Sequence, residues 1–217
     1  IIENWKKTLW ISIPAIGANM MVPISNTIIT ALVATYGAKN IAGYGVGGRL
    51  EPLALVFIIS LSASVTPFVG QNWGAEKYER VKKSIFYAVK IALIWGLITA
   101  SLLAIFATSI SQLFSKDILV QKTIKLYLWT IPISYGFYGT VSLINASLNA
   151  INKPYIAISI SSLRLFVFYI PLAWFGSKLY QLKGLFIGAT LGNILMGIIS
   201  LWIMTRVMAN VKENSVK

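Results

Sequence analysis

PLALVFIISLSASVTPFVG, the sequence of residues 52–70, contains no charged side chain, and its only hydrophilic residues are three serines and one threonine. Small hydroxyls can hydrogen-bond back to the helix that carries them, so about 20 such residues can cross roughly 30 Å of hydrocarbon. Arg49-Leu50-Glu51 precedes the stretch, and a glycine turn and a basic loop follow it. These residues predict a membrane-spanning helix.

The composition agrees with this prediction. Of the 217 residues, 57% are hydrophobic and 12% are charged, and the mean hydropathy is +0.74. Too few polar side chains remain to cover a water-soluble globule. The net charge of +13 does not indicate a nucleic-acid partner, because the basic residues lie between apolar runs. We therefore expect an all-α integral membrane protein whose main partner is the lipid bilayer.

Six apolar runs are long enough to cross the bilayer, and they predict a single six-helix bundle over residues 1–217. Their approximate bounds are 8–36, 41–72, 84–114, 118–150, 155–175 and 184–206. Six crossings put both termini on one side. The densest basic cluster, Lys77 to Lys83, lies on that side, so the excess of positive charge predicts a multi-pass protein of the plasma membrane with both termini in the cytoplasm.

Catalytic and metal chemistry have little support. The chain has no cysteine and no histidine, which removes thiol nucleophiles, imidazole bases and the usual transition-metal ligands. All acids except one lie in loops or tails: Glu3, Glu76, Glu79, Asp117 and Glu213. The glycine run of residues 43–48 resembles a phosphate-binding loop only in composition. We expect no enzyme activity, no metal and no cofactor. Because the sequence begins at Ile1 and not at methionine, we also expect the chain to be a part of a longer protein or to have lost its start.

Prolines interrupt four of the six runs. Each removes a backbone donor and favours a kink, which suits a bundle that opens and closes around a cavity. The alternative is that proline is simply more frequent in membrane helices. The predicted kink positions are Pro14, Pro23, Pro52, Pro67, Pro132 and Pro171.

The first and fourth runs share a short pattern. Trp10-Ile11-Ser12-Ile13-Pro14 is similar to Trp129-Thr130-Ile131-Pro132, and a stretch dotted with polar residues follows each. Such a match favours an internal repeat of three helices, which is a common feature of transporters.

Polar amides within the runs are candidates for a solute pathway. Asn19 and Asn26 are seven residues apart and Asn145 and Asn149 are four apart, so each pair shares one helical face. Buried polar groups in a membrane face the bundle interior, where they line a pathway for a polar or cationic solute or bond one helix to another.

Glu51 is the only acid in or beside a run, which makes it the candidate for a proton or cation site. A second interpretation stays open, in which Glu51 forms a structural ion pair with Arg49 at a kink before Pro52. That pair needs local unwinding, because residues two apart do not face each other on a helix. Arg164 lies deeper, and it binds an anionic group, binds Glu51 or extends toward the interface.

Four segments resemble the C-terminal half of the multidrug and toxic compound extrusion (MATE) transporters. They are AGYGVGGRLE at residues 42–51, TPFVGQNWGA at 66–75, ASLNAINKP at 146–154 and LRLFVFYIPLAW at 163–174. The resemblance runs along nearly the whole chain and is specific only when the four segments are taken together.

The resemblance implies helices 7 to 12 of a pseudo-symmetric twelve-helix transporter, in which two lobes face a central cavity and export organic cations in exchange for Na⁺ or H⁺. Members with acids in helices 7 and 10 would carry them near Val22 and Tyr138, and neither is acidic here. We expect Glu51, Arg49, the asparagines and Tyr138 to line one wall. The expected protein partner is the N-terminal lobe or a second copy.

Two alternatives remain open at this point. A lipid-linked saccharide flippase shares the general architecture of the wider superfamily, and the resemblance then implies a cationic cavity around Arg164. A fragment that does not transport is also possible, because half a transporter cannot alternate access alone.

Overall fold

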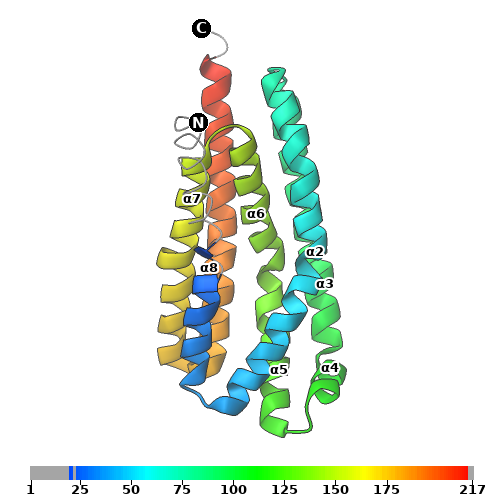
Figure 1. Ribbon diagram of the computed structural model, residues 1–217, viewed down its shortest axis with the longest axis vertical. Coiled ribbons are helices and arrows are strands. Elements are labelled where there is room, and N and C mark those ends of the chain that lie inside the picture. The colour runs from blue at the N-terminus through cyan, green and yellow to red at the C-terminus, as the bar shows by residue number, and fades with distance from the viewer. Residues whose placement is uncertain (1–19, 22, 215–217) are drawn as a thin grey trace, which may run out of the picture.

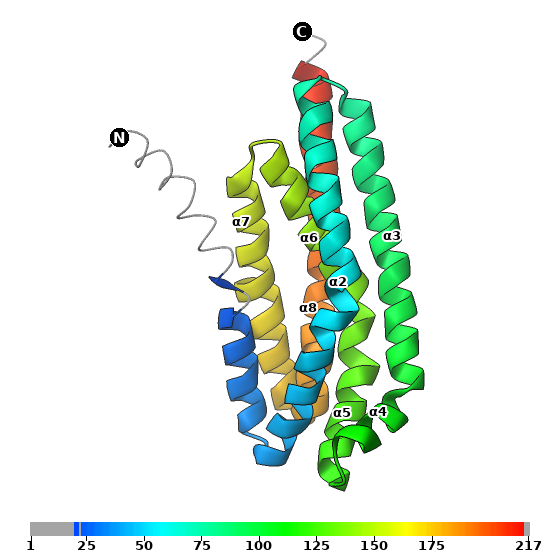
Figure 2. The same ribbon diagram turned by 45° about the vertical axis from the view of Figure 1, so that its right-hand side comes forward.

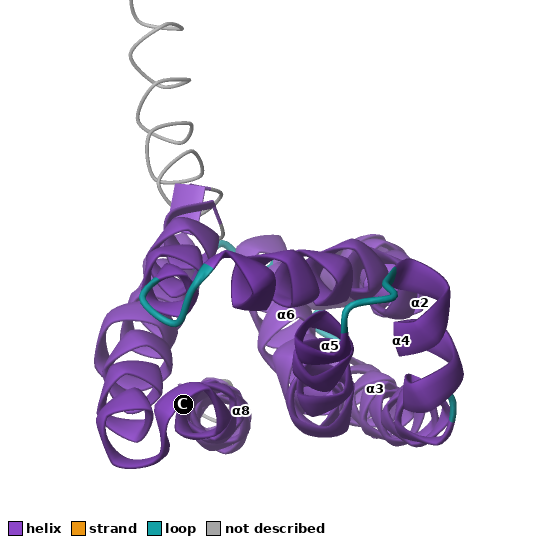
Figure 3. Cartoon of the chain, turned by 90° about the horizontal axis from the view of Figure 1, so that it is seen from below, coloured by secondary structure: helices purple, strands orange, loops and turns teal. Residues whose placement is uncertain are grey.

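Long helices that run roughly along one axis make up the protein, as Figure 1 and the end-on view of Figure 3 show. The computed structural model describes residues 20–21 and 23–214, and no strand occurs among them. The predicted kink at Pro14, the amide of Asn19 and the first half of the repeat lie outside the described residues, as does Val22.

Helix α2 (Ala38–Gly74) follows the short apolar helix Pro23–Ala34. It exceeds the predicted range of 41–72 by a few residues at each end. Helical geometry continues through Pro52 and Pro67. A proline can bend a helix without breaking it, so kinks at these two residues stay predictions. The hydroxyls of Ser60, Ser64 and Thr66 donate to carbonyls of the same helix, as in the contact of 2.9 Å from Ser60 to the Val56 carbonyl, whereas the Ser62 hydroxyl pairs with that of Ser142 over 3.5 Å.

The third predicted crossing is two helices, α3 (Tyr78–Ile105) and α4 (Ala107–Phe114). Helix α3 begins six residues before the predicted start at 84, because Val81 is buried and the Tyr78 ring packs edge-on against Trp73 at a centroid distance of 5.0 Å. Buried apolar residues therefore occur among the lysines of the predicted basic loop, and the helix includes them.

The fourth predicted crossing is interrupted in its middle. It comprises α5 (Ile118–Thr130), the 3₁₀ turn η1 (Ile131–Ser134) and α6 (Tyr135–Ala150). Pro132 lies in η1, where its missing donor fits the change from α-helical to 3₁₀ hydrogen bonding. Asp117 caps α5, because its carboxylate accepts from the backbone N–H groups of Leu119 and Val120.

The last two crossings form a hairpin. It begins with α7 (Pro154–Ser162) and the π-helical turn η2 (Leu163–Tyr169), and α8 (Ile170–Asn214) follows directly. Within α8 the backbone leaves helical geometry at Tyr180 and Gln181, and the chain reverses there (Figure 1). The fifth crossing thus extends past its predicted end at 175, and Pro171 lies near the start of α8 without breaking it.

Glycines hold the two arms of this hairpin close together. A Cβ at Gly188 would lie 2.0 Å from the Leu172 carbonyl oxygen, and one at Gly192 would lie 2.8 Å from the Tyr169 Cα. Small residues allow such close backbone approach between membrane helices. The arms therefore behave as one packed unit.

By length and composition, three helices among the described residues are long and apolar enough to cross a membrane: Ala38–Gly74, Tyr78–Ile105 and Pro154–Ala209. The last contains the reversal at Tyr180 and Gln181, so it corresponds to two of the predicted crossings. The fourth predicted crossing is divided by η1, which leaves its two helices shorter.

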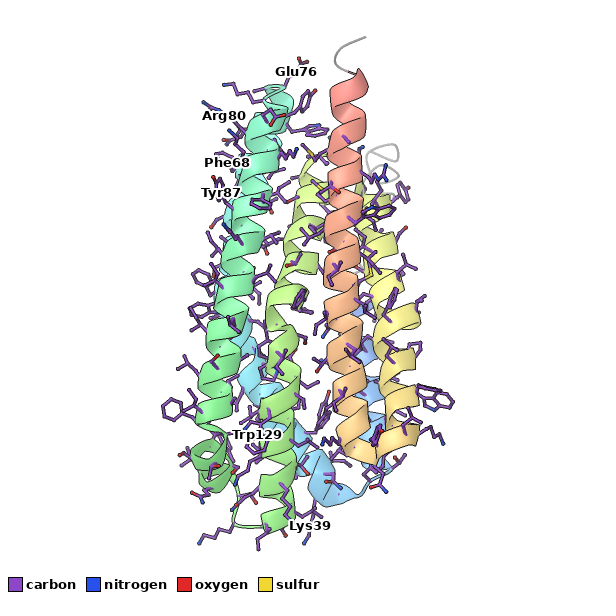
Figure 4. All side chains as sticks on the ribbon, turned by 180° about the vertical axis from the view of Figure 1, so that it is seen from behind. Lys39, Phe68, Glu76, Arg80, Tyr87 and Trp129 are labelled. Atoms are coloured by element: carbon purple, nitrogen blue, oxygen red, sulfur yellow. The ribbon has the colours of Figure 1, made fainter. Side chains whose placement is uncertain are left out.

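The two ends of the bundle carry different loops. Glu76 and Arg80 lie at one end and Lys39 at the other (Figure 4). At the Glu76 end, the hairpin of α2 and α3 stands beyond the turn that joins α6 to α7 (Figures 1 and 2). At the Lys39 end, the Lys39 Nζ lies 2.6 Å from the Asp117 carboxylate.

Candidate functional site: a polar cluster around Glu51 and Arg164

Glu51 turns inward from α2 and is half-buried. Its Oε2 accepts a hydrogen bond of 2.6 Å from the Tyr127 hydroxyl on α5, a length typical of a hydrogen bond to a carboxylate. Because α2 stays helical across residues 49–52, Arg49 points elsewhere and is exposed. The interpretation of Glu51 as the partner of Arg49 is therefore wrong, since the acid bonds a tyrosine from another helix.

Arg164 is the buried charge of the site, with 8% of its surface exposed. It lies in the π-helical turn η2, and its Nη1 donates to the Asn193 Oδ1 on α8 over 3.2 Å. The Asn193 Nδ2 in turn donates to the Ser134 Oγ over 3.2 Å. This chain of contacts joins the two segments with non-α geometry, η2 and η1, through α8.

Aromatic rings enclose the two charges. The rings of Tyr44, Tyr127 and Phe186 form a triangle with centroid distances of 5.8, 6.1 and 5.6 Å. The Arg164 guanidinium lies 5.0 Å from the centre of the Tyr138 ring, within the range of a cation–π contact. Enclosure by rings lowers the exposure of both charges to water and strengthens their interactions.

Glu51 lies close enough to Arg164, Tyr135 and Tyr169 to interact with them electrostatically. No ion pair within 4.0 Å joins Glu51 and Arg164 in the described part of the chain. We define the Glu51–Arg164 cluster as five residues: Glu51, Tyr127, Ser134, Arg164 and Asn193. It takes side chains from α2, α5, η1, η2 and α8.

Tyr138 contacts the cluster through Arg164, and the remaining candidate side chains among the described residues form no hydrogen bond with it. Arg49, Asn26 and Asn149 are exposed. Asn145 is half-buried and its Nδ2 donates to the Ser161 Oγ on α7 over 2.9 Å, while its Oδ1 is buried and has no partner among the described residues. The asparagines at 145 and 149 thus differ in environment, although they share a helical face.

No group of three or more metal-ligating side chains of the His, Cys, Asp and Glu types occurs among the residues described. The Glu51–Arg164 cluster offers one carboxylate, one tyrosine hydroxyl, one serine hydroxyl, one amide and one guanidinium. Such a set can bind and release a proton or hold a charged group of a solute, and it supplies no nucleophile and base pair for hydrolysis.

Tyr127, Asn193 and Ser134 were not among the site residues predicted from the sequence. Asn193 was within reach, since it is an amide inside the last apolar run and the rule applied to Asn19 and Asn145 covers it. Tyr127 carried no comparable signal, because tyrosines in membrane helices are frequent at the interfaces.

Buried charged side chains within membrane helices are typical of secondary transporters. The sequence profile of the family described as MatE matches residues 14–175, so the chain belongs to the MatE family of membrane transporters. The predicted family and the predicted fold class, an all-α membrane lobe of a transporter, are both confirmed.

Individual relatives and solved structures agree with this family assignment. The chain is 34% identical over 212 residues to a FAD transporter of Shewanella oneidensis and covers 98% of its own length and 47% of that protein. It is 32% identical over 108 residues to the multidrug export protein MepA of Staphylococcus haemolyticus, a match that covers 49% of this chain and 24% of MepA.

The bent form of the Vibrio cholerae MATE transporter VcmN superposes with a TM-score of 0.90 and 31% identity, covering 97% of this chain and 48% of VcmN. The chain therefore spans about half the length of the relatives that it matches along its whole extent.

Proposed function

We propose that the chain is the C-terminal lobe of a secondary active exporter and works with a second six-helix lobe across a central cavity. The family membership and the coverage of about half of each long relative support this proposal. Alternating access needs two units that move against each other. The second unit is the N-terminal lobe of the same transporter, and a second copy of this chain is the alternative.

The proposed cargo is an organic cation, exported in exchange for Na⁺ or H⁺. Relatives named for multidrug export or multidrug resistance support it. The observation that carries the exchange is Glu51, an acid inside a membrane helix that accepts a hydrogen bond from Tyr127. An acid so placed can alternate between a charged and a neutral form as the lobe changes partner.

The pathway proposed for the solute follows from exposure. Arg49, Asn26 and Asn149 are exposed side chains on helices that otherwise present apolar residues, so they suit the face that meets the second lobe. Tyr138, Asn145 and Arg164 lie deeper, and they suit contacts made once a solute has entered. Both termini are proposed to face the cytoplasm, since the basic loop of residues 77–83 lies on that side.

The experiment that tests the exchange is transport by the full two-lobe protein in proteoliposomes with a pH or Na⁺ gradient. Glu51→Gln keeps the shape of the side chain and removes the charge, and we expect it to abolish gradient-driven efflux of an organic cation dye such as ethidium. Glu76→Gln is the matched control, because Glu76 is exposed in the turn between α2 and α3. Efflux by Glu51→Gln at the level of the parent protein would assign Glu51 a purely structural role.

A second candidate cargo is an anion with an aromatic group. Arg164 is buried beside Tyr138. The match to the FAD transporter of S. oneidensis covers 98% of this chain. A guanidinium binds phosphate and stacks on aromatic rings. Proteoliposomes loaded with FAD and ethidium together would separate the candidates. Export of FAD that is lost in Arg164→Gln supports the anion, whereas export of ethidium alone supports the organic cation. If neither FAD nor ethidium is exported and the protein binds only a phosphorylated lipid, the proposed cargo becomes a lipid-linked saccharide.

A further inference from the structure

The four glycines between residues 43 and 48 divide into two kinds. Gly43 and Gly47 are buried against α5: a Cβ would lie 2.6 Å from the Thr123 Cβ at the first position and 2.4 Å from the Tyr127 Cδ1 at the second. Gly45 and Gly48 have nothing within 4 Å of a Cβ. The buried pair is four residues apart and shares one face of α2, so these glycines allow the close crossing of α2 and α5.

Gly47 and Glu51 are also four residues apart, and they lie on the same face one turn from each other. One helical turn rises about 5–6 Å, which is close to the length of a tyrosine ring with its hydroxyl. The ring of Tyr127 starts beside Gly47, with its Cγ 2.6 Å from an added Cβ, and its hydroxyl ends at Glu51. The ring therefore lies along α2 and bridges the turn.

The ring of Tyr127 has no room to yield. The side chain is 2% exposed, and its other sides contact Tyr44 and Phe186. A methyl group at residue 47 must therefore displace the ring, and the hydroxyl moves away from Glu51 with it.

We propose that Gly47 is a positioning residue for the Glu51 carboxylate: the missing side chain lets the Tyr127 ring lie along α2, and the hydroxyl then fixes the acid for ion exchange. The inference rests on the proposed role of Glu51. Gly43 serves the same crossing but lies one turn further from the acid, so it should affect packing and not the acid. The ionisable groups near enough to Glu51 to interact with it electrostatically, besides Tyr127, are Tyr44, Tyr135, Tyr169 and Arg164.

The test compares Gly47→Ala with Gly43→Ala and Gly48→Ala in the full two-lobe protein. The readouts are pH-difference infrared spectra, in which the Glu51 carboxyl band is identified by its absence in Glu51→Gln, and the pH profile of transport. We expect Gly47→Ala and Tyr127→Phe to move the band and the pH midpoint in the same direction and to slow transport about tenfold, as the loss of a hydrogen bond to a charged group predicts. Gly43→Ala and Gly48→Ala should leave the band and the midpoint unchanged.

Two results would overturn the inference. One is an unchanged carboxyl band in Gly47→Ala. The other is a double variant of Gly47→Ala and Tyr127→Phe that is slower than Tyr127→Phe alone, since effects that pass through one hydroxyl are not additive.

Failure of Gly47→Ala to fold is also informative. Gly47→Ala combined with Tyr127→Leu removes the ring, and it should fold with the pH profile of Tyr127→Leu alone. If this pair also fails to fold, something other than the ring excludes the methyl group and the inference is wrong. A band shift in Gly47→Ala together with normal transport by Glu51→Gln would retain the positioning role and reject the ion-exchange role of Glu51.

Discussion

Arg164 donates to Asn193 across 3.2 Å and so ties the π-helical turn of the fifth crossing to the middle of the last one. Asn193 passes the contact on to Ser134 in the 3₁₀ turn of the fourth crossing. The Asn193 amide thus accepts a hydrogen bond from the buried Arg164 guanidinium and donates one to Ser134, where the fourth crossing is interrupted.

Replacement of this amide should destabilise the lobe. Asn193→Leu is similar in volume and leaves the Arg164 guanidinium without a buried acceptor, so we expect a loss of about 1–3 kcal/mol in the free energy of unfolding. Thermal unfolding in detergent measures it. Asn149→Leu is the control, because Asn149 is exposed; equal losses in the two variants would contradict the special role of Asn193.

Acid should weaken the loop contact at the Lys39 end. The hydrogen bond from Lys39, together with the backbone N–H groups of Val120 and Leu119, lowers the pKa of Asp117 below its ordinary value of 3.8. A lowered folded-state pKa means that the contribution to stability is complete above the unfolded-state pKa and is lost as the pH falls through the folded-state value. Lys39→Gln should therefore lower the unfolding temperature at pH 7 and have no effect at a pH where Asp117 is protonated.

The cap and the charge of Asp117 can be separated. Asp117→Asn keeps an acceptor for the first N–H groups of α5 and loses the charge, whereas Asp117→Ala loses both. We expect the alanine variant to unfold at a lower temperature than the asparagine variant at neutral pH. Equal unfolding temperatures would show that the side chain does not cap α5 in solution.

Close packing in the last hairpin predicts a sharp difference between glycines. Gly188→Ala places a methyl group against the Leu172 carbonyl oxygen, and we expect overpacking to cost about 1–3 kcal/mol of unfolding free energy. Gly45→Ala has open space around the new group and should be neutral or slightly stabilising, since alanine favours helix. Thermal unfolding of the two variants side by side is the measurement.

The proposed orientation can be tested by cysteine labelling, because this lobe has no cysteine of its own. In a protein whose other lobe has also been freed of cysteine, Arg80→Cys should react with a membrane-impermeant maleimide only after the cells are opened. Lys116→Cys, in the turn before α5, should react in intact cells. The reverse pattern would place both termini outside.

Helix positions followed from the sequence because the apolar runs are long and the breaks between them are marked by charges and glycines. The run predicted at 41–72 is α2 at Ala38–Gly74. The π-helical turn at Leu163–Tyr169 has no such mark, because its residues are hydrophobic apart from Arg164, and the turn packs closely against Gly192 of α8.

The candidate site was predicted in part. Glu51 and Arg164 stood out because charges are rare in apolar runs, but the partner of Glu51 was sought two residues away and lies 76 residues away. Contacts between distant segments depend on how the helices cross, and a single sequence does not encode that crossing in a local pattern. The role of Gly47, which has no Cβ, could be inferred only once the Tyr127 ring was known to lie beside it.

The extension of the α2 and α3 hairpin beyond the neighbouring turn (Figures 1 and 2) has a practical consequence for imaging. The two helices meet at this end, where the rings of Trp73 and Tyr78 are in contact, so the tip is a rigid projection that moves with the lobe. A small rigid binding protein selected against the tip around Glu76 would add an asymmetric, water-exposed feature to a particle otherwise hidden in a detergent belt. It would leave Glu51 and Arg164 untouched, because they lie far along the helices from that tip.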